Sequence, residues 1–185
     1  MDNFLEEVVT KHRGGAQGLK MVLAWFFMIV FALYGFMQLQ NVMMSISMEG
    51  FTLNVLIYVV QLIIFGGVAV LIFLFKDRIK TEYEYTFTNG QMDFAQVYNN
   101  AKRKSLGTMN IRNVEACGMV ASGSFQRYIN MPGVKRTNWF LNRDANLLYF
   151  YFQKESNKRM IVIEPSEEMV GLIKKYLPQG IWQNN

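Results

Sequence analysis

Cysteine, histidine and proline are scarce in this chain of 185 residues, which has one, one and three of them. The single cysteine, Cys117, excludes an internal disulfide and with it a disulfide-stapled secreted domain. The common metal sites need more His and Cys ligands than this, so we expect no metal and no cofactor. Cys117 lies on a predicted strand and His12 lies in an N-terminal leader, so we expect no Cys–His nucleophile pair.

Charged residues are absent from two long apolar runs, 21–39 and 55–75. As helices, the runs span about 28 and 31 Å at about 1.5 Å per residue, close to the roughly 30 Å core of a bilayer. A helix is favoured there because every backbone polar group must be satisfied inside the segment. We predict transmembrane helices at 21–40 and 55–75. The alternative, a buried hairpin in a soluble core, usually has shorter apolar segments.

The flanks of the two runs predict an uncleaved anchor and its orientation. The first run is longer than a signal-peptide core of roughly 7–15 residues and ends without small residues for cleavage. The connecting loop, 41–54, has no Lys or Arg, whereas three stand on each outer side: Lys11, Arg13 and Lys20, then Lys76, Arg78 and Lys80. Loops rich in Lys and Arg stay in the cytoplasm, so both termini should be cytoplasmic in a bacterial plasma membrane.

The remainder, 76–185, has the size of one domain and holds 16 Lys and Arg against 10 Asp and Glu, a net charge of +6. Tyr83, Tyr85 and Phe87 alternate with polar residues, which indicates a strand. Asn89-Gly90 then favours a two-residue hairpin turn. The apolar pattern of the return strand slips near Ala95, where we expect a bulge. Further strands are expected at 104–110, 114–121, 137–141, 147–152 and 160–163, with a long loop at 122–136.

The hydrophobic period changes after the last predicted strand. Ser166 is suited to cap a helix, and Glu167 and Glu168 follow in its first turn. Apolar residues then recur at helical spacing until Pro178 prevents continuation. The segment 147–152 is apolar on both faces, which predicts a central, covered strand. We therefore expect an α+β membrane protein: a two-helix transmembrane hairpin, then about seven antiparallel strands and a C-terminal helix.

This order of elements resembles that of pleckstrin-homology-like domains. Several strings also resemble an uncharacterised family of small two-span bacterial membrane proteins that contain a domain of unknown function. They are Thr81–Gly90, Met131–Gly133, Asn138–Asn142, Glu164–Met169 and Gly180–Trp182. We expect a cytoplasmic leader at 1–20 before the membrane hairpin, and the resemblance implies that the hairpin is followed by a pleckstrin-homology-like cytoplasmic domain, at 76–185. It implies no reaction.

The composition favours a non-enzymatic protein, because the usual nucleophile, base and metal constellations are absent from the sequence. One hypothesis is a protein-interaction or scaffolding module held at the inner leaflet by the lipid bilayer, with Trp139, Phe140 and the loop 122–136 as candidate contacts for an unidentified protein. These aromatics also suit a core. The alternative is a sensor of anionic lipid surfaces. Nucleic-acid binding is not expected, since the tyrosines alternate at strand spacing. The candidate lipid contacts are Lys102, Arg103, Lys104, Lys135 and Arg136.

Overall fold

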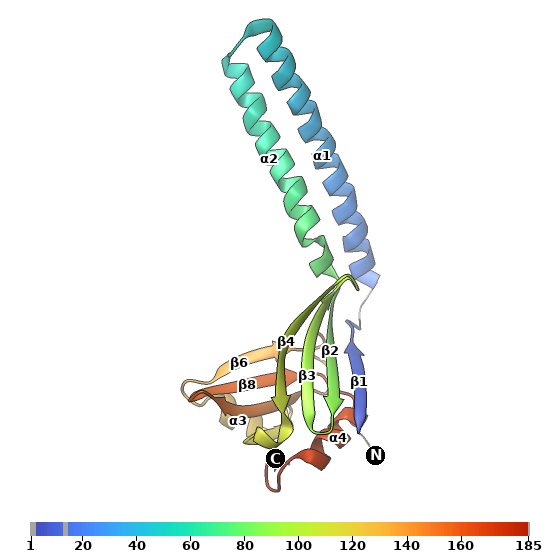
Figure 1. Cartoon of the computed structure of the whole chain (residues 1–185), viewed down its shortest axis with the longest axis vertical. Coiled ribbons are helices and arrows are strands. Elements are labelled where there is room, and N and C mark those ends of the chain that lie inside the picture. The colour runs from blue at the N-terminus through green and yellow to red at the C-terminus, as the bar shows by residue number, and fades with distance from the viewer. Residues whose placement is uncertain (1–2, 13–14, 185) are drawn as a thin grey trace. The chain divides into compact units, whose positions relative to one another are not determined.

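The protein is described from a computed structural model, which covers residues 3–12 and 15–184 (Figure 1). Arg13, which counted toward the predicted orientation, lies outside the described residues. The chain divides into two compact units. One comprises residues 13–80, and the other joins residues 1–12 to 81–185.

The first unit is a pair of long helices, α1 (Gly15–Glu49) and α2 (Leu53–Phe75), followed by the short 3-10 helix η1 (Lys76–Ile79). Both long helices have the length and apolar composition needed to cross a membrane. Helix α1 continues well beyond residue 40, so the connection contains residues 50–52 rather than the expected 41–54. Residues 41–49 contain no glycine or proline that would end a helix, so α1 continues to the residue before Gly50.

Close packing joins the two helices where α1 has a glycine. A Cβ atom added to Gly35 would lie 3.3 Å from the backbone nitrogen of Gly66. Next to this contact, the rings of Tyr34 and Phe65 pack edge to face with their centroids 4.4 Å apart. Small residues at such positions allow helix backbones to approach closely.

The second unit contains two β-sheets. Sheet A is antiparallel with the order β1-β2-β3-β4, formed by β1 (Phe4–Val9), β2 (Thr81–Thr88), β3 (Gln91–Tyr98) and β4 (Lys102–Asn110). Asn89 and Gly90 connect β2 to β3 with φ of 50° and 93°, as in the predicted hairpin turn. The register of β3 against β4 shifts between Phe94 and Ala95, where the sequence predicted a bulge.

Strand β1 comes from the segment that the sequence had suggested was only a leader. Its six residues pair with β2 along their whole length, from Phe4 opposite Thr88 to Val9 opposite Tyr83. Leu5 and Val9 pack against the core of the domain. Residues 4–9, which precede the first long helix in the chain, are therefore an integral strand of the β domain.

Sheet B has the order β6-β8-β7-β5-β9. The 3-10 helix η2 (Ile111–Asn113) comes before this sheet in the chain. The strands of sheet B and the helices between them then follow in this order: β5 (Ala116–Met119), α3 (Gly123–Ile129), β6 (Lys135–Trp139), β7 (Leu148–Lys154), β8 (Asn157–Ile163), α4 (Glu167–Tyr176) and β9 (Trp182–Gln183). The expectation of antiparallel strands alone is wrong here, because β6 pairs with β8 in parallel and β5 pairs with β9 in parallel. The expected long loop at 122–136 is also wrong in part, since α3 occupies residues 123–129.

The core lies between the two sheets, and α4 closes it. Tyr85, Phe87 and Phe94 of sheet A contact Phe150 and Ile163 of sheet B in one buried cluster that also includes side chains from α4. A second cluster forms where α3 covers the opposite face of sheet B. The first four residues of β7, 148–151, are buried on both faces of the sheet, as the apolar sequence predicted.

Candidate functional site at the β1 edge

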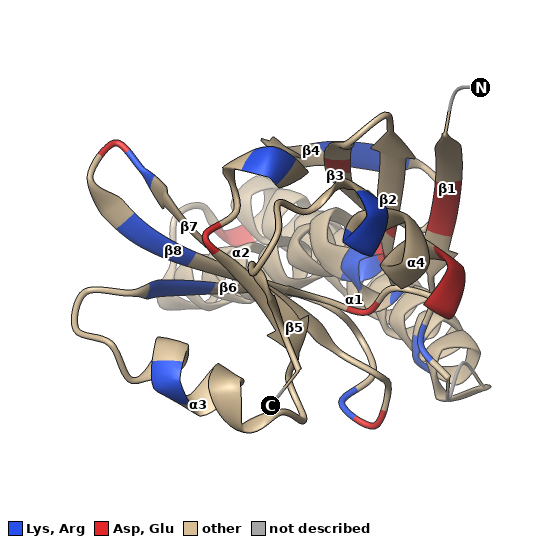
Figure 2. Ribbon diagram, turned by 90° about the horizontal axis from the view of Figure 1, so that it is seen from below, with Lys and Arg blue, Asp and Glu red and all other residues tan. Residues whose placement is uncertain are grey.

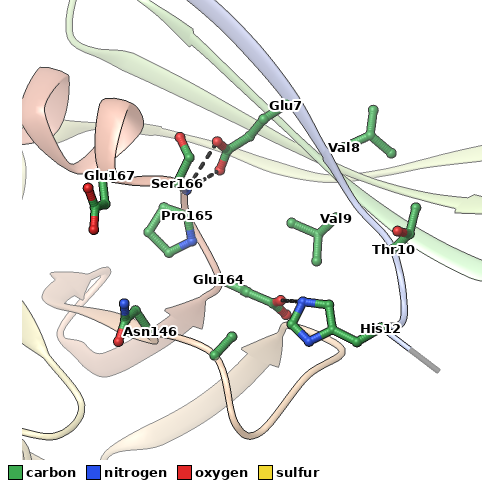
Figure 3. A pocket seen from close by; sticks show the side chains of 11 residues that line it. Glu7, Val8, Val9, Thr10, His12, Asn146, Glu164, Pro165, Ser166 and Glu167 are labelled. Atoms are coloured by element: carbon green, nitrogen blue, oxygen red, sulfur yellow. Dashed lines mark hydrogen bonds and ion pairs between the residues drawn. The ribbon is translucent and has the colours of Figure 1, made fainter.

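A cavity of about 480 Å³ lies beside β1 and the segment that joins β8 to α4 (Figure 3). Its lining is rich in acids: Glu7 comes from β1, Glu164 from the joining segment, and Glu167 is the first residue of α4. His12 and Asn146 complete the polar part of the wall. These side chains come from three segments that are far apart in the sequence.

Asn142, which is buried, fastens the chain at the end of β1. Its side-chain nitrogen donates to the carbonyl of Thr10 at 2.9 Å, and its side-chain oxygen accepts from the backbone nitrogen of His12 at 2.9 Å. The amide thus bonds to two alternate residues of one strand edge, much as a neighbouring strand would. This contact fixes the chain just before it leaves the domain for the first membrane helix.

The side chain of Glu164 is buried and accepts hydrogen bonds from Asn142 and from the residue before it. One carboxylate oxygen accepts from the backbone nitrogens of Leu141 and Asn142, at 3.1 and 2.9 Å. The other accepts from the side-chain nitrogen of Asn142 at 2.7 Å and lies 3.8 Å from Nε2 of His12. A buried carboxylate with several donors is a stable arrangement rather than an available base.

Glu7 occupies a less favourable position. Its carboxylate accepts from the backbone nitrogen of Ser166, at 3.1 Å from each oxygen. Burial raises the pKa of the Glu7 carboxyl above its ordinary value, the bonds from Ser166 oppose this, and the charges of Glu164 and Glu168 add to it. The site therefore stabilises the ionised form of Glu7 poorly.

Tyr85 links the two sheets under the site. Its hydroxyl donates to the carbonyl oxygen of Trp139 and accepts from the backbone nitrogen of Glu164. Burial strongly raises the pKa of this phenol, so it stays protonated as a donor. Tyr85 thus holds the segment that carries Glu164 against β2.

The free edge of β1 is open beyond the Asn142 contact. Backbone groups alternate along an antiparallel strand between the partner and the free side. The backbone nitrogen of Asn89 donates to the carbonyl of Asn3, so the odd-numbered residues of β1 bond to β2. The backbone groups of Phe4, Glu6 and Val8 therefore point away from sheet A.

The same strand exposes apolar side chains. Phe4 is 61% exposed and Val8 is 51% exposed. Among the described residues of the β domain, these two are the large hydrophobic side chains left exposed; the others of this kind belong to the two long helices and the turn between them. An open strand edge with exposed apolar residues is a typical pairing site for another chain.

The site offers little for catalysis. The hydroxyl of Ser166 accepts from the backbone nitrogen of Met169 at 3.1 Å and caps α4. Cys117 is fully buried in the core, and burial raises the pKa of its thiol well above the usual range. No group of three or more His, Cys, Asp and Glu residues suited to a metal occurs in the part of the chain that the structure describes.

The five candidate lipid contacts fall on two different sheets. Lys102, Arg103 and Lys104 are exposed at the start of β4, and the Nε atom of Arg103 lies 2.7 Å from a carboxylate oxygen of Glu84. The other two candidates, Lys135 and Arg136, are exposed at the start of β6. There the parallel pairing sets Lys135 opposite Arg159 and thereby groups cations that are distant in sequence.

The two candidate partner contacts belong largely to the core. Trp139 is half-buried with its ring centroid 4.8 Å from that of Phe94. Phe140 packs against the cluster beneath α3. Within the expected loop, Phe125 is buried against Tyr149. These aromatic side chains therefore pack in the core, which was the second interpretation given in the sequence analysis.

The clasp of His12, Asn142 and Glu164 has no counterpart in the sequence analysis. The sequence analysis placed His12 in the N-terminal leader. In the structure it lies near two acids that are distant in sequence, Glu164 and Asp144, the latter at 3.9 Å. Only the pairing of β1 with β2 brings these segments together, and no local motif encodes it.

Comparison with known proteins gives one result. A model of the family described as Bacterial PH-like domain (DUF6106) matches residues 1–183, nearly the whole chain. No curated protein and no solved structure matches it. The match covers β1 as well as both long helices, in agreement with a β domain to which the N-terminal strand belongs. The chain, a membrane protein with two candidate transmembrane helices, belongs to this bacterial pleckstrin-homology-like family.

Proposed function

We propose that the protein is a membrane-anchored, non-enzymatic interaction or scaffolding module on the cytoplasmic face of the bacterial plasma membrane. The observation that supports this most is the open edge of β1, where Phe4 and Val8 are exposed. A soluble domain gains nothing from such an edge, which promotes association. Pleckstrin-homology-like domains act mostly in binding, and the acids of the site are engaged in structural bonds.

A photocrosslinking amino acid tests this proposal in native membranes. We place it at Phe4, on the open edge, and at Lys175, an exposed residue of α4 that serves as the matched control. The proposal predicts a discrete crosslinked product from position 4 and none from position 175. If neither position gives a product, or both give the same diffuse smear, the β1 edge is not an interaction surface.

A second candidate function is contact with an anionic lipid surface through the basic end of sheet B. Lys135 and Arg136 of β6 lie beside Lys158 and Arg159 of β8, and Lys154 stands at the adjoining hairpin. Figure 2 shows this as blue ribbon on β6 and β8. Each basic residue near an anionic leaflet contributes about 1 kcal/mol of attraction.

Lysine modification in nanodiscs tests the second candidate. The full chain is inserted into anionic or neutral nanodiscs and acetylated with a water-soluble reagent. Contact predicts slower acetylation of Lys135 and Lys158 in the anionic discs, and the difference should shrink as salt rises. Lys175 serves as the reference residue. Equal rates in both lipids would eliminate the candidate.

A further inference from the structure

The two free edges of sheet A carry opposite charge. β1 has Glu6 and Glu7, whereas β4 begins with Lys102, Arg103 and Lys104. Figure 2 shows red ribbon on β1 and at the start of α4, and blue ribbon on β4. β1 and β4 are the two outer strands of sheet A, whose order is β1-β2-β3-β4.

We propose that the open edge of β1 receives strand β4 of a second copy of this chain, so that sheet A continues from one molecule into the next. The inference rests on the proposed interaction function and names its partner. Three antiparallel pairings separate β1 from β4, so β4 runs opposite to β1 within one molecule. In equally oriented copies, β4 of one molecule would therefore pair antiparallel with β1 of the next.

The register also brings the charges to the same side. Lys104 pairs with Gln96, and Gln96 pairs with Tyr83, which faces the core. Lys102 lies two residues away on the same face. Glu7 pairs with Tyr85 and shares that core-facing side. In a continuous sheet, both lysines of the incoming strand would lie on the side where the cavity is lined by Glu7, Glu164 and Glu167.

Charge disfavours the symmetric alternatives. Pairing β1 with a second β1 would set Glu6 and Glu7 against the same acids, and pairing β4 with β4 would set its three cations together. Like charges opposite one another destabilise a strand pair. The contact between copies is therefore head to tail. Such contacts lead to rings or open chains rather than closed dimers.

Charge reversal tests the pairing in the purified full-length protein in mild detergent, with association followed by sedimentation. One variant combines Glu7→Lys with Glu167→Lys, the acids on the core-facing side, and another combines Lys102→Glu with Lys104→Glu. Each should raise the midpoint concentration of association at least about tenfold, because several cross-strand pairs of opposite charge become pairs of like charge. A chain with all four substitutions should return close to the wild-type midpoint. Arg127→Glu with Lys175→Glu, exposed and on neither edge, is the control.

A second variant tests the backbone of the edge. Val8→Pro removes an N–H that points away from β2, so it should leave the fold intact, as circular dichroism can verify, yet abolish association. The proposal is overturned if the wild-type chain is monomeric throughout or stops at a dimer. It is also overturned if Val8→Pro or the single-edge reversals associate as the wild type does. A monomeric chain that still gives a discrete crosslink to another protein from position 4 would overturn the second copy alone and leave the interaction function standing.

Discussion

Asn142 is the residue on which the position of β1 depends most. Its side chain bonds the backbone at Thr10 and His12 and also donates to the buried Glu164. These three partners belong to two segments separated by most of the chain, and the asparagine connects them.

Replacing Asn142 with alanine should lower the stability of the β domain by at least about 1–3 kcal/mol, the usual cost of leaving one buried polar group without its partner. Chemical denaturation of the full chain, followed by the near-ultraviolet signal of its tryptophans, measures this. Asn146→Ala, an exposed residue of the same cavity, should change stability little. Equal loss in both variants would contradict the role given to Asn142.

Glu7→Gln should stabilise the protein at neutral pH. The pKa of the carboxyl is raised in the folded chain above its ordinary value of 4.5, so burying the ionised form costs stability at pH 7. That cost disappears as pH falls through the raised pKa to the unfolded value. Glutamine keeps an oxygen for the Ser166 N–H and carries no charge.

Thermal unfolding from pH 7 to pH 4 measures the effect of Glu7→Gln. The melting temperature of the variant should exceed that of the wild type at pH 7, and the two should converge toward pH 4. Glu155→Gln, at the exposed turn between β7 and β8, is the control and should give no converging difference. A variant that is less stable than the wild type at pH 7 would refute the assignment.

At the scale of elements, the helix pair depends on the close approach at Gly35. Leucine at this position would meet the backbone of α2, since even a Cβ atom would lie 3.3 Å from Gly66. Gly35→Leu should therefore lower the SDS concentration at which the helix pair unfolds in micelles. Gly67→Leu, where a Cβ meets no atom within 4 Å, should not. If both variants unfolded at the same lowered SDS concentration, the effect would come from the size of the added side chain and not from the contact at Gly35.

Elements with a complete local signal could be predicted from the sequence. The β2–β3 hairpin has alternation on both sides of Asn89-Gly90, and the cap at Ser166 precedes an apolar stripe. β1 has no such signal, because Glu6 and Glu7 interrupt any alternation and only pairing with β2 makes the segment a strand. Helix α3 begins at Gly123, a poor helix former, and depends on burial of Phe125 against β7.

The candidate site was beyond sequence reasoning for a related reason. Its bonds join residues from the first twelve positions to residues 142 and 164. Hydrogen bonds over such separations leave no spacing pattern in the chain. The basic residues were visible from composition, but the grouping of Lys135 with Arg159 needed the parallel pairing of β6 with β8.

At the scale of the whole molecule, β1 is the part of the domain that directly precedes the first membrane helix in the chain. Only residues 13 and 14 stand between His12 and α1. Any partner that adds to the β1 edge thus binds a strand that is close in sequence to the anchor. The proposed sheet between copies would couple neighbouring anchors through this short connection.

Thiol labelling tests the central claim, that the long helices cross the membrane and leave the β domain in the cytoplasm. Native Cys117 is buried in the core, away from the reagent, so single cysteines report on their own positions. In intact cells, a membrane-impermeant maleimide should label Phe51→Cys, in the exposed turn between α1 and α2, and leave Lys175→Cys unlabelled until the membrane is permeabilised. Labelling of position 175 in intact cells, or failure to label position 51 before lysis, would contradict the account.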